Sequence, residues 1–488
     1  MFGLMPAPGL GCPDLQWFNV AQPLSLADLR GRLVILDFWT PCCVNCLQAL
    51  PTLNLLQKTY CDRLIIIGVT SPKYPAERDP EAVAHAIARH DIRHPVVHDP
   101  DLTLWRAYDV SAWPTLVFID PEGNILGQLQ GEPQAERLIS GTGEMIRSWR
   151  RTDTAPLPPL PLTVPAQAAG ALRFPGKIKP LIRPGGPKQW AVADTGHHQI
   201  VVFGDDGEEV ARYGRGQPGF ADLGADDSAF RAPEGLVCDA RFIYVADTGN
   251  HAIRRIDLAG GGVTTLAGTG ARGPALSRPL AGRDASLASV WDLEILGDDL
   301  FFANAGTHQI GAVDLASGIV RPLAGGAGED LIDGDASRAL LAQPSGLALD
   351  PQGRALYFTD SEASAVRRLS LCAAPKVETI VGAGLFDFGS ADGDLADARM
   401  QHCLGLAWWA DGLIVADTYN SQLRLIDLER HRVSRLSSGG HIQGPGLSGG
   451  EPAGVTADGA DRLLVSDTNH HRIIEICMRE RRARAWAA

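Results

Sequence analysis

The chain has 488 residues, of which 45% are hydrophobic and 21% charged, so it can form two or three compact domains and is not a disordered polymer. Its 54 glycines and 33 prolines favour many turns and short strands over a mainly helical fold. The formal charge of −13 argues against a general nucleic-acid binder, because such a protein needs a basic surface.

Targeting signals and cysteine usage indicate the compartment. The longest apolar runs fall far short of the roughly 18 residues that a transmembrane helix needs. The first basic residue is Arg30, so the N-terminus lacks the charged start of a secretory signal. Nine scattered cysteines, an odd number, are not a disulfide framework. We therefore expect a soluble, cytoplasmic protein that does not associate with membranes.

The first 152 residues alternate strand-like and helical patterns, which predicts a small α/β sheet domain over 1–152. Pro51 interrupts the first helical pattern. The strand-like runs are 33–37, 64–69, 116–119 and 125–129, and the helical patterns are 46–60 and 80–90. The last two strand-like runs flank an Asp-Pro-Glu-Gly turn at 120–123, which predicts a hairpin.

Cys43 and Cys46 form a C-x-x-C pair between the first strand-like run and the first helical pattern. At a helix N-terminus the unpaired backbone N–H groups and the helix dipole favour a thiolate. Two thiols in one helical turn can also close into a disulfide, which suits thiol–disulfide exchange. A bare C-x-x-C also suits zinc, but zinc needs two further ligands and no second C-x-x-C exists. We therefore predict no metal and no cofactor.

Two further motifs resemble the thioredoxin fold, namely Asp37-Phe38-Trp39 before the cysteines and Trp113-Pro114-Thr115 before a strand-like run. The resemblance implies that Cys43 is the nucleophile and Cys46 the resolving thiol. It also implies that Asp37 is a buried proton acceptor and that Pro114 is a cis-proline that faces the disulfide and guides the substrate.

Two positions depart from the thioredoxin pattern, which usually has Trp before the first active cysteine and Pro before the second. Here these positions are Cys42 and Asn45. Cys42 could compete for the disulfide, modulate the pair or be inert. The spacing from Thr40 to Cys43 is also similar to peroxiredoxins, although Leu36 replaces their preceding proline. A thiol peroxidase-like activity is therefore an alternative.

A proline-rich run predicts a linker over 153–167. Residues 154–165 read TAPLPPLPLTVP, and such a sequence favours extended polyproline II structure, which acts as a semi-rigid spacer. The pattern changes after this run, and the change supports a domain boundary.

After the linker one phrase recurs six times at intervals of 50 to 57 residues, with strand-like runs around each copy. Four strands per unit, repeated six times, predict an all-β propeller over 168–478. The copies are Ala193–Ile200, Ala246–Ile253, Ala303–Ile310, Thr359–Val366, Ala416–Asn420 and Ser466–Ile473. Because a structural turn is needed once per blade and a catalytic site once per protein, the repeated aspartates and histidines are interpreted as turn residues.

The end of the chain carries two further expectations. The last blade lacks an evident fourth strand, so residues 168–174 are predicted to supply it and close the ring. Residues 479–488, which include four arginines, are predicted to form a basic, solvated tail.

The repeats resemble NHL repeats, whose Asn-His-Leu motif survives as Asn250-His251-Ala252 and Asn469-His470-His471. A thioredoxin-like domain with a Cys-Cys-x-x-Cys loop joined to a six-bladed NHL propeller is similar to the NHL-repeat-containing protein 2 family. This resemblance implies a redox-like domain and an interaction platform.

Besides the thiol peroxidase-like alternative, three functions remain. The leading one is a thiol–disulfide oxidoreductase whose propeller loops bind a protein substrate or partner. The second is a non-catalytic scaffold with a degenerate thioredoxin fold. The third places a catalytic site in the propeller channel. Nucleic-acid binding is disfavoured by the acidic balance, and the sequence does not determine the oligomeric state.

Overall fold

The computed structural model describes all residues except 1–4, 12–14, 150–161, 164–169, 327 and 437–441. Contacts divide the chain into two units, residues 1–167 and 168–488. Most of the predicted linker, 153–167, lies outside the described residues; Leu162 and Thr163 are described, and they bond to Val20 and Asn19 of the first unit. Among the described helices, none has the length and apolar character that a membrane crossing requires.

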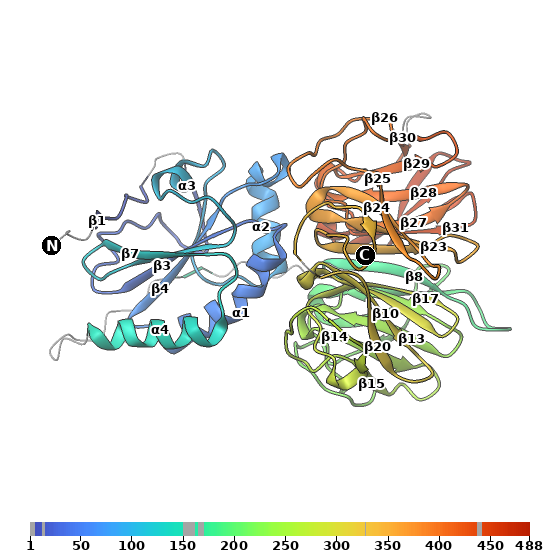
Figure 1. Cartoon of the computed structure of the whole chain (residues 1–488), viewed down its shortest axis with the longest axis horizontal. Helices are drawn as coiled ribbons and strands as arrows, with labels where there is room; N and C mark the ends of the chain where they lie inside the picture. The colour runs from blue at the N-terminus through green and yellow to red at the C-terminus, as the bar shows by residue number, and fades with distance from the viewer. Residues whose placement is uncertain (1–4, 12–14, 150–161, 164–169, 327, 437–441) are drawn as a thin grey trace. The chain divides into compact units, whose positions relative to one another are not determined.

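The first unit contains a mixed sheet, with strand order β1-β7-β6-β3-β4-β5-β2 in the described residues (Figure 1). Strands β3, β4 and β5 run parallel, and their neighbours are antiparallel. The predicted hairpin is confirmed as β6 and β7. The strands are β1 (Met5–Pro6), β2 (Gln16–Phe18), β3 (Leu33–Trp39), β4 (Leu64–Thr70), β5 (Val96–His98), β6 (Thr115–Ile119) and β7 (Asn124–Gln130).

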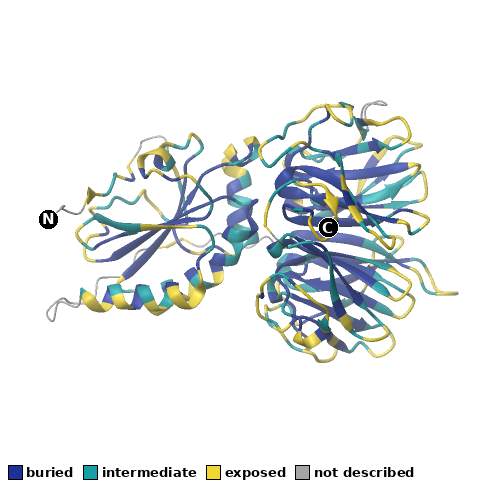
Figure 2. Cartoon of the chain, viewed as in Figure 1, coloured by how far each residue is buried: buried dark blue, intermediate teal, exposed yellow. Residues whose placement is uncertain are grey.

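Both faces of this sheet are covered. Helices α1 and α4 contact each other and share a core with one face, while α3 and the N-terminal segment pack on the other. Every residue of β3 and β4 is therefore buried, which explains their continuous apolar sequences (Figure 2). The helices are α1 (Val44–Thr59), α2 (Pro80–Arg89), α3 (Thr103–Ala107) and α4 (Ala135–Ser148), with a 3-10 turn η1 (Pro75–Arg78).

The second unit is a six-bladed propeller of antiparallel blades, as predicted (Figure 1). The inner strands adjoin one another in cyclic order, and the last returns to the first. The inner strands are β8 (Pro175–Leu181), β12 (Gly235–Cys238), β17 (Val290–Leu296), β22 (Pro344–Leu349), β27 (Gly405–Trp409) and β31 (Gly454–Asp458). The second strands are β9 (Gln189–Asp194), β13 (Phe242–Asp247), β18 (Asp299–Asn304), β23 (Ala355–Asp360), β28 (Gly412–Asp417) and β32 (Arg462–Asp467).

The outer half of each blade follows the repeated phrase, which forms a 3-10 turn between the second and third strands. The third strands are β10 (Gln199–Gly204), β14 (Ala252–Asp257), β19 (Gln309–Asp314), β24 (Ala365–Ser370), β29 (Gln422–Asp427) and β33 (Arg472–Cys477). The outer strands are β11 (Glu209–Tyr213), β15 (Val263–Ala267), β20 (Ile319–Gly325), β25 (Lys376–Val381), β30 (Arg432–Arg435) and β34 (Arg482–Ala487). In the described part of the propeller, three blades carry a short further strand, namely β16 (Leu280–Ala281), β21 (Gly334–Asp335) and β26 (Gly393–Asp394).

Glycine begins several inner strands because neighbouring inner strands approach closely there. A Cβ atom on Gly235 would lie 2.4 Å from the carbonyl oxygen of Trp291, and one on Gly405 would lie 2.6 Å from that of Ala453. These distances are too short for any side chain, so the glycines at these two positions mark close contacts between blades.

The two expectations for the end of the chain are wrong. Residues 482–487 are β34, the outer strand of the last blade, and not a solvated tail. The arginines of β34 face solvent while Ala483 and Trp486 are buried, which explains why a basic segment forms a strand. No closing strand forms in residues 170–174, the described part of the expected segment, and the first blade instead starts with β8 at Pro175.

Candidate active site

Cys43 lies at the start of α1, directly after the loop that leaves β3. It is the N-cap residue of the helix, with an extended backbone, and its Sγ accepts the N–H of Cys46 at 3.3 Å. The sulfur therefore occupies the position where a helix N-terminus stabilises negative charge.

The three neighbouring cysteines differ in burial. Cys43 is 7% exposed, whereas Cys42 and Cys46 are each 1% exposed. Burial raises the pKa of the Cys46 thiol well above its usual range, and the hydrogen bond and charge of Cys43 raise that pKa further. Cys43 is therefore the more accessible thiol, and Cys46 is the thiol that needs a base before it can react.

Asp37 lies in the middle of the buried strand β3 and is 1% exposed. Burial raises the pKa of its carboxyl group from 3.8 to about 7. Neither carboxyl oxygen has a hydrogen-bond partner among the described residues, and its charge raises the pKa of Cys46. A carboxyl group that titrates near neutral pH beside a thiol can accept the proton of that thiol.

Pro114 follows a cis peptide bond with Trp113 and precedes β6. Because Thr115 of β6 pairs with Phe38 of β3, Pro114 lies at the sheet end from which the cysteine loop emerges. The indole of Trp113 donates a hydrogen bond to the carbonyl oxygen of Ser71 at 2.9 Å, and its ring lies 4.4 Å from that of Trp105.

Cys42 contacts two buried polar residues, Thr40 and Glu77. Its Sγ lies 3.7 Å from the hydroxyl oxygen of Thr40, and its backbone N–H donates to Oε1 of Glu77 at 3.2 Å. The Thr40 hydroxyl also donates to Glu77. Asn45 lies in the first turn of α1 and is half-buried.

Sequence reasoning missed Glu77, which is 2% exposed and lies in η1, beyond β4. Burial raises the pKa of this carboxyl group, while hydrogen bonds from Thr40 and three backbone N–H groups lower it. The signal in the sequence was that Glu77 is the third residue of a helical turn that begins at Pro75. This position predicts a local cap but no contact with the cysteine loop.

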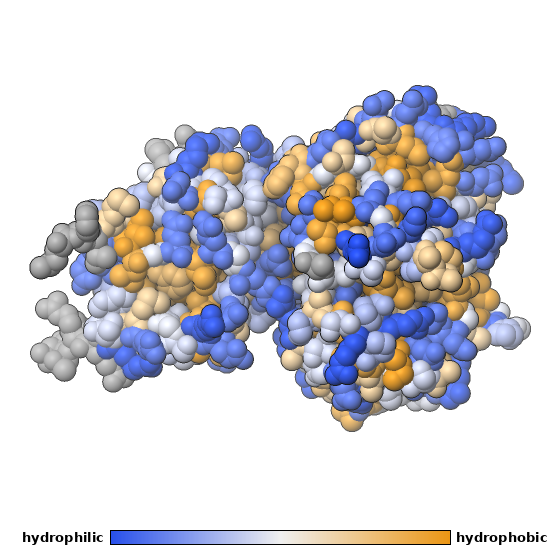
Figure 3. All heavy atoms as spheres, in the orientation of Figure 1, coloured by the Kyte–Doolittle hydropathy of each residue, from blue (hydrophilic) through white to orange (hydrophobic). Residues whose placement is uncertain are grey.

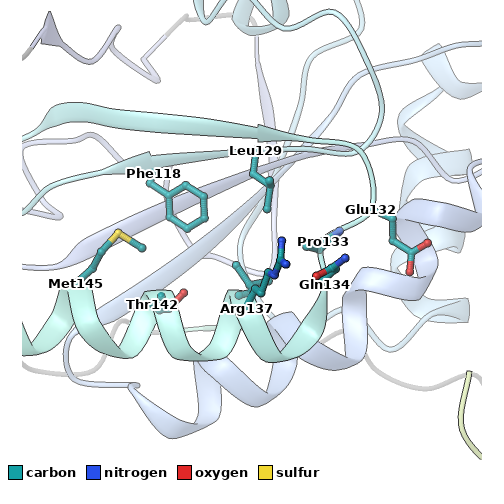
Figure 4. Close-up of a pocket in the computed structure, with 10 residues that line it drawn as sticks. Phe118, Leu129, Glu132, Pro133, Gln134, Arg137, Thr142 and Met145 are labelled. Atoms are coloured by element: carbon teal, nitrogen blue, oxygen red, sulfur yellow. The ribbon is translucent and has the colours of Figure 1, made fainter.

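A separate cavity of about 320 Å³ lies between α4 and strands β6 and β7 (Figure 4). Side chains from the strands and from α4 point toward one another across it. They include Phe118, Leu129, Arg137, Thr142 and Met145, and no cysteine lines the cavity. It is therefore distinct from the dithiol site.

The repeated aspartates of the propeller hold turns together. Oδ1 of Asp247 accepts the N–H of Arg231 at 2.8 Å, and its Oδ2 accepts from Asn250 and from the buried Arg254. Asp360 and Asp417 bind an arginine seven residues later in the same way. Each carboxylate is thus used by its own blade, which favours the structural interpretation.

Side chains of the inner strands bond across the propeller channel. Lys179 of β8 pairs with Glu294 of β17 at 3.0 Å. Lys177 of β8 donates to the carbonyl oxygens of Leu404 and Ala453, which precede β27 and β31. Because these charged groups bind one another or the backbone, they favour a structural role over catalysis in the channel.

Comparisons with known proteins agree with this architecture. A thioredoxin-like family model matches residues 31–125. NHL repeat-containing protein 2 of Gallus gallus is 36% identical over 511 residues, which cover 94% of this chain and 68% of that protein. Protein SUPPRESSOR OF QUENCHING 1, chloroplastic, of Arabidopsis thaliana is 35% identical over 484 residues, 94% of this chain and 45% of that protein. Thiol-disulfide oxidoreductase ResA of Bacillus cereus is 29% identical over 132 residues, 27% of this chain and 72% of that protein.

The fold and the cysteine loop define a protein with a thioredoxin-like domain followed by an NHL-type β-propeller. The identity and coverage show that this chain belongs to the NHL repeat-containing protein 2 family.

Proposed function

We propose that the protein is a thiol–disulfide oxidoreductase in which Cys43 and Cys46 are the exchanging pair. The observation that carries this proposal is the position of Cys43 as the helix N-cap, with the buried Cys46 one turn later. The similarity of the first unit to a named thiol–disulfide oxidoreductase supports it. The scattered cysteines favour a reducing compartment such as the cytoplasm.

The reaction follows from these positions. The Cys43 thiolate attacks one sulfur of a substrate disulfide, and the other substrate sulfur leaves as a thiolate. Asp37 then accepts the proton of Cys46, and the Cys46 thiolate attacks the Cys43 sulfur. The bond between Cys43 and the substrate breaks, the second substrate sulfur leaves and takes a proton, and Cys43 and Cys46 are oxidised to a disulfide. Pro114 lies beside this loop and would support the substrate chain.

Reduction of insulin with dithiothreitol as the final reductant tests the proposal. We expect Cys43→Ser to abolish the rate above background and Cys46→Ser to lower it at least about tenfold, because each variant removes one sulfur of the exchange. Cys42→Ser is the matched control and should keep most of the rate. A rate that neither Cys43→Ser nor Cys46→Ser changes would instead favour a non-catalytic scaffold.

We further propose that the propeller binds a protein partner through its loops. Large hydrophobic side chains are exposed on several of these loops, including Phe220 at 40% and Phe386 at 73%. Hydrophobic and hydrophilic residues are intermixed on the face of the propeller seen in Figure 3. Such a mixed surface resembles a non-obligate protein interface more than a site for nucleic acid.

A further inference from the structure

Glu77 connects the cysteine loop to the segment that follows β4. Its Oε2 accepts the N–H groups of Lys73 and Tyr74, at 2.8 and 3.0 Å, and these bonds cap its own helical turn. Its Oε1 accepts the N–H of Cys42, which lies 35 positions earlier in the chain. The bond to Cys42 does not cap the turn. It therefore connects Glu77 to the cysteine loop.

The bond to Cys42 determines how that residue is placed. With its N–H held by Glu77, Cys42 is 1% exposed and its sulfur lies beside the Thr40 hydroxyl. The adjacent Cys43 is instead at the helix start, with its sulfur directed to the N–H of Cys46. Two neighbouring cysteines thus have different environments, although both are close in sequence to Cys46.

We propose that Glu77 is a positioning residue that determines which cysteines pair, since it keeps Cys42 toward Thr40 and leaves Cys43 to exchange with Cys46. This inference rests on the proposed dithiol function. Without the bond, the Cys42 thiolate could attack the Cys46 sulfur of the disulfide. That step forms a Cys42–Cys46 bond, breaks the Cys43–Cys46 bond and releases Cys43 as a thiolate, with no external oxidant.

Glu77→Gln separates capping from positioning. A glutamine has one acceptor oxygen, which can still cap Tyr74 and Lys73, as glutamine does in capping boxes. Its amide nitrogen then faces the N–H of Cys42, and two donors cannot bond. Glu81→Gln, at an exposed position in the first turn of α2, is the matched control.

The experiment measures the Cys42–Cys46 disulfide in the full chain carrying Cys43→Ser, equilibrated with glutathione and its disulfide. Two protein thiols and one glutathione disulfide give one protein disulfide and two glutathione thiols, and peptide mapping identifies the bond. We expect Glu77→Gln to raise the equilibrium constant about tenfold or more, because it leaves the buried N–H of Cys42 without its acceptor, and Glu81→Gln to leave it unchanged. Thr40→Val, which keeps Glu77 and its cap, should also raise this equilibrium constant.

The decisive comparison is between the chain with Cys43→Ser alone and the chain with both Cys43→Ser and Glu77→Gln. If their equilibrium constants are equal, and Thr40→Val also has no effect, Glu77 does not position Cys42. Failure of the proposed function gives a different result. In that case the chain with Cys42→Ser would form no Cys43–Cys46 disulfide under the same conditions, whatever residue occupies position 77.

Discussion

Asp37 is a buried carboxyl group whose ionisation opposes folding. Its pKa is raised from 3.8 to about 7, so between these pH values the unfolded chain releases a proton that the folded chain retains. The contribution of this group to the free energy of unfolding is therefore fully present below pH 3.8 and is lost as the pH rises to 7. At about 1.4 kcal/mol per pKa unit, the loss is on the order of 4 kcal/mol.

We therefore predict that Asp37→Asn stabilises the first unit at pH 8 and has little effect at pH 4, while it slows disulfide exchange. Hydrogen–deuterium exchange of β3 and β4 peptides in the full chain measures this stability, and insulin reduction measures exchange. Asp101→Asn, at a largely exposed side chain, is the control. An equal effect at both pH values would contradict the role of ionisation.

The site residues show what local sequence can predict. Cys43 and Cys46 come directly after a strand-like run, so the local pattern predicted their place at the start of a helix. The places of Asp37 and Pro114 were implied by the resemblance to the thioredoxin fold. The contact between Glu77 and Cys42 depends on how two loops meet, and no local pattern encodes it.

At the scale of elements, a repeated hydrogen bond joins neighbouring blades. The residue after each 3-10 turn has a left-handed backbone, and in four blades it is a histidine. Nδ1 of His198, His251 and His308 accepts a backbone N–H from Ala232, Ser289 and Gln343 of the next blade. Ser364 accepts from His402 in the same way, and His471 accepts from Phe174 and thus connects the last blade to the first.

This bond requires an unprotonated nitrogen, so blade contacts depend on pH. Burial lowers the pKa of both His251 and His308 to about 4; Arg272 and Arg231 lower that of His251 further, while for His308 Asp360 opposes the shift and Arg272 adds to it. The unfolded chain, with an ordinary pKa near 6.5, binds more protons between pH 6.5 and 4. Stability is therefore present above pH 6.5 and falls as the pH is lowered to 4.

We predict a loss on the order of 3 kcal/mol for each of these two histidines at pH 4. Hydrogen–deuterium exchange of β14 and β19 peptides should show protection that decreases below pH 6.5. Asparagine tolerates the left-handed backbone, so replacing His251 or His308 by Asn should reduce the pH dependence of this protection. If the variant with both His251→Asn and His308→Asn keeps the same pH dependence, other groups cause it.

The sequence revealed the recurring histidines and aspartates of the repeats but not their partners. The arginines that bind Asp247, Asp360 and Asp417 recur seven residues after each, and this signal was available in the sequence. The residues that donate to the histidines share a left-handed backbone rather than a side-chain type, so the amino-acid pattern did not reveal them.

At the scale of the propeller, β34 connects the two ends of the ring. Trp486 is 7% exposed and packs against Trp190 and Phe203 of the first blade, with ring centroids 6.5 and 5.6 Å apart. Its indole donates to the carbonyl oxygen of Asp205 at 3.2 Å. The alternation of Arg and Ala from position 482 was a strand signal, but the charge of the segment favoured a tail.

We predict that Trp486→Ala destabilises the propeller by about 3–5 kcal/mol, as expected for removal of a buried tryptophan. The exposed Phe386→Ala should change stability by no more than about 0.5 kcal/mol. Protection of β9 and β33 peptides against hydrogen exchange measures the effect on both blades. Loss of protection in neither blade would show that β34 does not hold the ring closed.

The trapped intermediate of exchange tests the central claim most directly. The full chain with Cys46→Ser lacks the resolving thiol, so the mixed disulfide between the protein and one half of the substrate should persist. After reaction with glutathione disulfide and blocking of free thiols, peptide mapping should find glutathione on Cys43. Attachment to Cys42 instead, or no attachment to either cysteine, would contradict the assignment of Cys43 as the nucleophile.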